Sequence, residues 1–229
     1  FLSDTLGGEF LLAGEAPGKA EMKAAAFEMA EQVEKLVKVY KNTKVDAQML
    51  KDADVDAVIL AIGSSPITIK LEGMDKLQHA SAPEVLRHEV CPKGKVAVIG
   101  GGLVGLETAD TLATDGCDVT VLEMKDEIGS DLGSLRKIAV MMKLQQMQVK
   151  MLPNSKVCKF TEEGIVLEDE TLVPCNCAVF AVGFASNDSH LLVEECEKRQ
   201  IPCRVIGDAK SARRALDAIA EGFEAARTL

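Results

Sequence analysis

Residues 95–107 read Lys-Val-Ala-Val-Ile-Gly-Gly-Gly-Leu-Val-Gly-Leu-Glu, and this stretch decides the fold. An apolar run typical of a buried strand leads into a glycine turn, and the turn leads into a helical pattern that continues to residue 114. A second β-branched run follows over residues 118–122. A strand, a glycine loop, a helix and a parallel strand form the repeating unit of a doubly wound α/β fold.

The glycine loop carries the first candidate site. Gly100 permits a tight turn, Gly102 lets a pyrophosphate approach the backbone, and Gly105 lets the helix pack closely on the strand. The N–H groups of the first helical turn then face the phosphates, whose charge the helix dipole favours. We therefore predict an adenine-dinucleotide site made by Gly100, Gly101, Gly102, Leu103, Val104 and Gly105.

Acidic residues flank this loop. Glu123 ends the second strand, where a carboxylate accepts hydrogen bonds from an adenosine ribose and repels a 2′-phosphate, so NADH is favoured over NADPH. Lys125 either weakens that preference by turning toward a phosphate or is a solvated turn lysine. Glu107 is placed in the first helical turn, where it either stabilises the dipole or reaches the nicotinamide, and both interpretations stay open. The other residues expected to line the site are Met124, Val182 and Gly183.

Composition excludes several functional classes. The chain has 229 residues, 47% of them hydrophobic, which is enough to bury a sizeable core. A net charge of −10, without a block of Lys and Arg, argues against nucleic acid as a partner. No apolar run reaches the roughly 18 residues that span a bilayer, and the first residues do not resemble a signal peptide. These features predict a soluble, cytoplasmic protein with no membrane partner.

Cysteines and histidines show no pattern typical of a metal, disulfide or catalytic site. The 7 cysteines are an odd number in a chain long enough to fold without disulfides. Cys175 and Cys177 are closer together than the cysteines of a CxxC motif, and strand alternation predicts both thiols buried on one sheet face. His79, His88 and His190 are scattered, so we expect surface or capping roles. No metal ligand and no catalytic side chain is predicted.

Strand-like and helical patterns alternate along the whole chain, which indicates an α/β fold. The predicted parallel strands span residues 56–62, 95–99, 118–122, 176–182 and 204–206. The predicted helices span residues 21–37, 103–114, 131–147 and 211–228. Short alternating segments near residues 155–175 predict a small antiparallel meander.

An internal repeat relates the two halves of the chain. Residues 56–63, Asp-Ala-Val-Ile-Leu-Ala-Ile-Gly, match residues 176–183, Asn-Cys-Ala-Val-Phe-Ala-Val-Gly. Upstream, residues 42–45 match 154–157, and residues 3–8 match 125–130. In the second copy the glycine loop begins 23 residues before Glu123, which corresponds to Phe1, so the loop of the first copy would precede residue 1. We therefore expect tandem Rossmann-like units, the first truncated at its N-terminus.

The order of the motifs resembles one superfamily. It runs Leu-Gly-Gly at 6–8, Ala-Ile-Gly-Ser-Ser-Pro at 61–66, the glycine loop, Ala-Val-Gly at 181–183 and Val-Ile-Gly-Asp at 205–208. This order is similar to that of the FAD/NAD(P)-dependent pyridine-nucleotide oxidoreductases. With its tail Ala-Leu-Asp-Ala-Ile-Ala-Glu-Gly-Phe-Glu-Ala-Ala-Arg at 215–227, the chain looks most like the C-terminal module of the 2,4-dienoyl-CoA reductase, NADH oxidase and trimethylamine dehydrogenase group.

That resemblance implies an FAD site in the first unit. Asp208 would hydrogen-bond the ribitol of FAD, although an Asp before a helix is also a candidate cap. Two positions depart from the family pattern, because Ile62 replaces a usual Thr and Phe1 replaces an acidic ribose ligand. The residues implied to lie along the flavin are Gly7, Gly8, Ala61, Gly63, Gly207, Asp208, Ala218 and Ile219.

The resemblance also implies an activity, the transfer of a hydride from NADH or NADPH to FAD. In the resembled group the electrons continue to an iron–sulfur cluster and FMN, whose ligands are absent from this sequence. The alternative is a non-redox module that binds ADP as a structural ligand. A redox CxxxxC or CxxC is absent, which argues against a disulfide reductase.

The expected domains are an incomplete, discontinuous FAD-type domain and an inserted NAD(P)-type domain. The first spans residues 1–78 and 200–229, and the second spans residues 79–199, with hinges near 77–89 and 188–202. The expected partners are adenine dinucleotides and an N-terminal portion of the same polypeptide, and the sequence leaves a homo-oligomer open.

Overall fold

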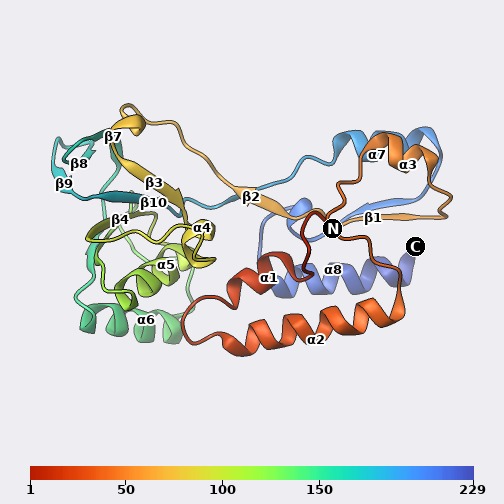
Figure 1. Ribbon diagram of the computed structural model, residues 1–229, viewed down its shortest axis with the longest axis horizontal. Helices are drawn as coiled ribbons and strands as arrows, with labels where there is room; N and C mark the ends of the chain where they lie inside the picture. Colours follow the sequence, from red (N-terminus) through yellow and green to blue (C-terminus); the bar gives the residue numbers. More distant parts are fainter. The chain divides into compact units, whose positions relative to one another are not determined.

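The computed structural model describes all residues of the chain, Phe1–Leu229. Contacts divide it into two compact units, which we call unit 1 and unit 2, and Figure 1 labels their elements. Unit 1 comprises residues 1–11, 21–65 and 184–229, and unit 2 comprises residues 12–20 and 66–183. The mixed α/β class predicted from the sequence is confirmed in both units.

A five-stranded parallel sheet forms the centre of unit 2. Val98 and Val121 are fully buried, because elements cover both faces of the sheet, as a parallel sheet requires. Two of these strands, residues 95–99 and 118–122, have the bounds that the sequence predicts. In spatial order the strands are β3 (Gln78–Ser81), β10 (Cys177–Phe180), β4 (Lys95–Ile99), β5 (Asp118–Leu122) and β6 (Lys150–Leu152).

Helices cover one face of this sheet and an antiparallel meander covers the other (Figure 1). On the helical face, Leu106 and Leu144 pack against Val96 and other strand residues. On the meander face, Phe160 packs with Ala97 and its neighbours. The predicted helix 103–114 and the predicted meander are confirmed. The helices are α4 (Ala82–Leu86), α5 (Leu103–Thr114) and α6 (Ser134–Gln146), and the meander is β7 (Val157–Thr161), β8 (Gly164–Leu167) and β9 (Leu172–Pro174), with the 3-10 turn η1 (Met74–Lys76) beside it.

The two neighbouring cysteines are buried as predicted but lie in different core clusters. Cys175 packs with the meander residues, whereas Cys177 packs with the helices on the opposite face. The prediction that both lie on one face is wrong, because β9 ends at Pro174 and β10 begins at Cys177, so the two residues do not share a strand. Burial raises the pKa of each thiol to about 11, which keeps both protonated and unreactive near neutral pH.

Unit 1 contains a two-stranded parallel sheet, and the predicted strands and helices of this unit are present with slightly different bounds. Arg199 donates hydrogen bonds to the carbonyl oxygens of Leu50 and Ala53, which caps the C-terminus of a short helix with a side chain of another. The strands are β1 (Val58–Leu60) and β12 (Cys203–Val205), and the helices are α1 (Gly8–Ala13), α2 (Ala20–Leu36), α3 (Ala47–Asp52), α7 (His190–Lys198) and α8 (Ala215–Thr228), with the 3-10 turn η2 (Gly207–Ala209). No helix in the chain combines the length and the apolar character needed to cross a membrane.

The observed unit boundaries differ from the predicted domain boundaries near residues 78 and 200. The stretch before β3 belongs to unit 2, because Phe160 N–H donates to the carbonyl of Glu72 (2.8 Å) and β3 pairs with β10. The chain instead crosses at 65/66, within β2 (Ser64–Pro66), and at 183/184, immediately before β11 (Phe184–Ser186), and these two strands pair with each other. Residues 12–20, predicted in the first domain, also belong to unit 2, where Leu12 and Ala16 pack with Leu86.

Candidate dinucleotide site

The glycine loop of unit 2 lies where three neighbouring parallel strands end. Gly100 follows β4 and donates its N–H to the carbonyl of Leu122 at the end of β5 (2.8 Å). Ala181 follows β10 and donates to the carbonyl of Ile99 (2.8 Å). β4 lies between these two strands, so the chain runs from β4 to one side through β5 and β6 and later returns to the other side at β10. In open α/β sheets, ligands bind at the carboxyl edge where this reversal occurs.

Each glycine of the motif meets a different requirement. Gly100 has φ +111°, and a Cβ there would lie 2.3 Å from the carbonyl oxygen of Ala181. A Cβ at Gly105 would lie 1.9 Å from the carbonyl oxygen of Gly100, so only glycine lets α5 approach the loop this closely. A Cβ at Gly102 would meet no backbone atom, only the carboxylate of Asp131, at 3.2 Å and beyond. The backbone at Gly102 is therefore covered by one side chain alone, and a pyrophosphate that displaces this carboxylate can approach it.

Glu123 holds the loop from the end of β5. Its Oε2 accepts the N–H of Gly101 (2.7 Å) and its Oε1 accepts the N–H of Lys125 (2.9 Å). A carboxylate has about four acceptor sites, so these two bonds leave capacity for ribose hydroxyls. Met124 is 65% exposed next to it, and Lys125 is also exposed. The geometry is compatible with the predicted ribose role, which remains a prediction.

Asp131 contacts the loop and was not singled out in the sequence. Its Oδ1 and Oδ2 lie 3.1 Å and 3.0 Å from the nitrogen of Leu103, the first residue of α5. The N–H groups expected to face phosphates thus include one that already donates to a carboxylate. The sequence separation of 28 residues hides this contact, since Asp131 has the ordinary pattern of an acidic residue before a helix.

Glu107 is held by two basic side chains. Lys19, from the segment 12–20, forms an ion pair with Oε1, and Arg136 donates to the same oxygen (2.8 Å). α5 begins at Leu103, so Glu107 lies beyond the first turn, contrary to the prediction. The dipole role is therefore wrong, because the dipole effect falls off within that turn. Only 14% of the Glu107 side chain is exposed, and two cations neutralise it there.

Other predicted residues occupy the same edge or the surface. Gly183 follows β10, has φ +105° and accepts the N–H of Ile67 (3.0 Å), while Val182 beside it is half-buried. The three histidines are exposed, as the sequence predicts; they are His79, His88 and His190.

Most of the candidate flavin residues of unit 1 gather where β1 and β12 end. Ile206 donates its N–H to the carbonyl of Leu60 (3.1 Å), which places Ala61 and Gly63 beside the turn that contains Gly207 and Asp208. The hydroxyl of Ser64 donates to Oδ2 of Asp208 (3.2 Å). Ala218 packs on this turn, since a Cβ at Gly207 would lie 3.3 Å from its Cβ, and Ile219 next to it is 53% exposed. Gly8 begins α1 and Gly7 precedes it, where a Cβ at Gly7 would lie 2.9 Å from the Cβ of Leu11.

Asp208 is not a helix cap. α8 begins at Ala215 with Arg214 as its N-cap, and the carboxylate of Asp217 accepts the N–H of Arg214 (3.2 Å). Asp208 instead accepts the N–H of Arg213 (3.2 Å), in the loop before the helix. The capping alternative is therefore wrong, and the ribitol role remains a prediction.

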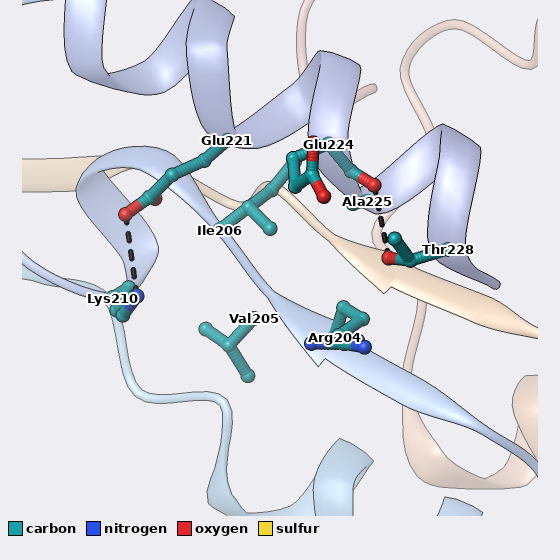
Figure 2. Close-up of a pocket in the computed structure, with 8 residues that line it drawn as sticks. All are labelled: Arg204, Val205, Ile206, Lys210, Glu221, Glu224, Ala225 and Thr228. Atoms are coloured by element: carbon teal, nitrogen blue, oxygen red, sulfur yellow. Dashed lines mark hydrogen bonds and ion pairs between the residues drawn. The ribbon is translucent and has the colours of Figure 1, made fainter.

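Glu221 fixes the turn after β12 and was missed in the sequence. Its carboxylate accepts the N–H of Gly207 (2.7 Å), bonds Lys210 (3.2 Å) and forms an ion pair with Arg213. Figure 2 shows Glu221 and Lys210 pointing toward each other at one side of a pocket between β12 and α8. The volume of this pocket is about 160 Å³. The side-chain bond from Arg213, then the backbone bond from Gly207, lowers the pKa of Glu221 to about 2.

Glu221→Gln should weaken the stability of unit 1 in a pH-dependent way. A carboxyl group with a folded pKa of about 2 and an unfolded pKa near 4.5 stabilises the fold fully above pH 4.5 and loses that contribution as pH falls toward 2. Urea denaturation across this range should therefore show a steep acid limb in the parent and a flatter one in Glu221→Gln. Glu224→Gln, in the same helix, is the control. Identical acid limbs in parent and variant would contradict the assigned contacts.

The sequence matches the model of the pyridine nucleotide-disulphide oxidoreductase family over residues 9–208. The chain belongs to this family. The family uses a flavin and a pyridine nucleotide, in agreement with the resemblance noted in the sequence.

This chain corresponds to only a part of each of the relatives compared with it. The chain is 34% identical to the bilirubin reductase of Mediterraneibacter gnavus over 98% of its own residues and 36% of that protein. It is 30% identical to the NADH oxidase of Thermoanaerobacter brockii, over 96% of its residues and 35% of that protein. Its fold matches a 2-naphthoyl-CoA reductase structure with a TM-score of 0.89 at 24% identity, covering 99% of this chain and 35% of the other. The chain thus spans about a third of these proteins.

Proposed function

We propose that this chain is the nucleotide-binding module of a larger flavin-dependent reductase, with NADH bound by unit 2 and FAD by unit 1. When bound, FAD accepts a hydride from the nicotinamide. The observation that carries the proposal is the Gly102 backbone, which lies at the carboxyl edge of a parallel sheet and meets no other backbone, only the carboxylate of Asp131. The family match supports it over most of the chain.

The residues of unit 2 would bind and orient the dinucleotide. The N–H groups at the start of α5 would hold the pyrophosphate, and Glu123 would hold the adenosine ribose. A 2′-phosphate next to Glu123 would be repelled, which favours NADH over NADPH. Val182 and Gly183 would border the nicotinamide. No side chain is assigned a proton-transfer role, so the contribution of the protein is positioning and exclusion of water.

The residues of unit 1 would hold the flavin through its ribitol and phosphate groups. Asp208 is oriented by Ser64 and Arg213, and Glu221 fixes the preceding glycine, so the turn is organised before a ligand arrives. Electron transfer onward to an iron–sulfur cluster and FMN, and reduction of an enoate or dienoyl-CoA substrate, would require parts of the protein outside this sequence.

One observation favours a second candidate, a module that binds ADP as a structural ligand. Glu107 is occupied by Lys19 and Arg136 and is therefore restrained from contacting a nicotinamide. A site that holds only the adenine half has no use for a free carboxylate at this position. The two candidates predict different affinities for NADH and ADP.

Calorimetric titration of the chain with NADH, NADPH, ADP and FAD tests the proposal, with Gly102→Val as the critical variant. Gly102 has φ −78°, which valine tolerates, so the added side chain acts by filling the phosphate cradle, where its Cβ would lie 3.2 Å from the carboxylate of Asp131. We expect NADH affinity to fall by roughly a hundredfold, which corresponds to about 2.7 kcal/mol. Gly133→Val, at an open glycine with φ −65° in the same unit, should leave binding nearly unchanged.

The outcomes separate the candidates. NADH binding that is tighter than NADPH binding and is lost in Gly102→Val supports the reductase module. ADP binding without a gain from the nicotinamide half supports the structural module. Binding that Gly102→Val does not alter contradicts both.

A further inference from the structure

The carboxylate of Asp131 lies where an anion would meet the start of α5. Both of its oxygens are within 3.1 Å of the nitrogen of Leu103, and one would lie 3.2 Å from a Cβ at Gly102. α5 has 12 residues, so its first N–H groups are at the positive end of a full helix dipole. Asp131 thus makes, from within the chain, the contact expected of a phosphate oxygen.

Two anions cannot both take this position. A carboxylate that accepts the N–H of Leu103 with both oxygens excludes a phosphate oxygen from the same donor. The charge of Asp131 also repels a pyrophosphate nearby, and Glu123 already places a second carboxylate on Gly101. A dinucleotide therefore has to displace Asp131 before α5 can bind its phosphates.

We propose that Asp131 sets the nucleotide affinity of this site as an intramolecular anion that competes with the pyrophosphate for the N–H group of Leu103. The inference rests on the proposed function, since it deepens the account of the same loop. A ligand that binds only when Leu103 is available has its apparent affinity reduced by the fraction of molecules in that state. Asp131 is an affinity-determining residue in this sense, with no part in hydride transfer.

The surrounding loop keeps the competitor close. Gly129, two residues earlier, donates its N–H to the carbonyl of Gly101 (2.7 Å), and Ile128 is buried in the core. The backbone before Asp131 is thus fixed to the glycine loop, while Asp131 itself is exposed. A tethered group acts at a high effective concentration, so the carboxylate returns to Leu103 whenever the phosphate leaves.

Asp131→Asn tests this inference, because it removes the charge and keeps the shape. We expect ADP and NADH to bind about tenfold more tightly to the variant by calorimetry, a change of about 1.4 kcal/mol. Asp131→Ser, which keeps a neutral oxygen, should act in the same direction. Asp126→Asn removes the same charge from an exposed position of the same loop and should change the affinity less than twofold.

Thermal denaturation distinguishes competition from a purely structural role. Without nucleotide, Asp131→Asn should unfold at a lower temperature than the parent, because a carboxylate stabilises the helix N-terminus. With saturating ADP the stabilisation should be larger in the variant than in the parent. A structural role alone would lower the unfolding temperature without tightening ADP binding. The inference would be overturned if both Asp131 variants bound ADP no more tightly than the parent does.

Inorganic pyrophosphate separates this inference from the proposed function. Its binding can be followed by the amide resonance of Leu103 in NMR titrations of the parent and of Asp131→Asn. If no nucleotide binds any variant but pyrophosphate prefers Asp131→Asn, the proposed function fails and the competition stands. If pyrophosphate perturbs Leu103 equally in both, the competition is overturned.

Discussion

Gly105→Ala is expected to destabilise unit 2 by about 3 kcal/mol or more. A Cβ at this position would lie 1.9 Å from the carbonyl oxygen of Gly100, and a backbone oxygen cannot rotate away as a side chain can. Alanine has the better helix propensity by about 1 kcal/mol, but the clash outweighs that gain because α5 would have to move off β4. Urea denaturation measures the change, and nucleotide affinity should fall with it.

Gly222→Ala provides the matched control. Gly222 also lies inside a helix, α8, but the nearest atom to its added Cβ is a side-chain carbon of Ile206 at 3.8 Å, an ordinary contact. Here helix propensity should decide, and the variant should be more stable by roughly 0.5–1 kcal/mol. If both substitutions changed the unfolding free energy in the same direction, close approach of α5 to the loop would not be the reason for a glycine at position 105.

Phe160→Ala should cost about 3–5 kcal/mol of unfolding free energy. Phe160 is only 1% exposed and fills the space between the meander and the sheet, with its ring centroid 5.9 Å from that of Phe180. Alanine would leave a cavity that the fixed strands cannot close. Guanidinium denaturation should show an earlier midpoint for the variant.

The control for this substitution is Phe223→Ala in α8. Phe223 is 66% exposed, so its truncation removes little buried surface and should cost less than about 1 kcal/mol. A comparable loss in both variants would mean that the meander does not form the second core cluster.

Local patterns predict much of this fold. The limits of β4, β5 and α5 follow from the sequence alone, because a β-branched run, a glycine turn and an apolar helical stripe each leave a local signal. The meander was also predicted from its alternation. Four short helices, α1, α3, α4 and α7, were not predicted, since each is too short to establish a period and is held by tertiary contacts.

The contacts of the candidate site were harder to predict. The loop glycines and Glu123 can be recognised in the sequence because their spacing follows from one βαβ unit. Lys19 reaches Glu107 across 88 residues, and Glu221 reaches back 14 residues to Gly207, with no periodic signal in either case. Such pairings depend on how the elements pack. The predicted domain boundaries differ from the observed unit boundaries for the same reason. β3 pairs with β10, which lies far along the chain.

The ladder between β2 and β11 has a consequence for how a chain of this kind is assembled. Ile67 donates to the carbonyl of Gly183, so the first and last residues of the long inserted stretch 66–183 lie side by side. Because the stretch is folded with its ends together, it costs a host domain no more conformational entropy than a short loop that spans the same gap. An excised segment 66–183 could therefore have its two ends joined and new termini opened elsewhere, which gives a circular permutant of this segment without the residues 12–20 that also belong to unit 2. The same geometry lets one folded unit be inserted into another during evolution without rebuilding the recipient.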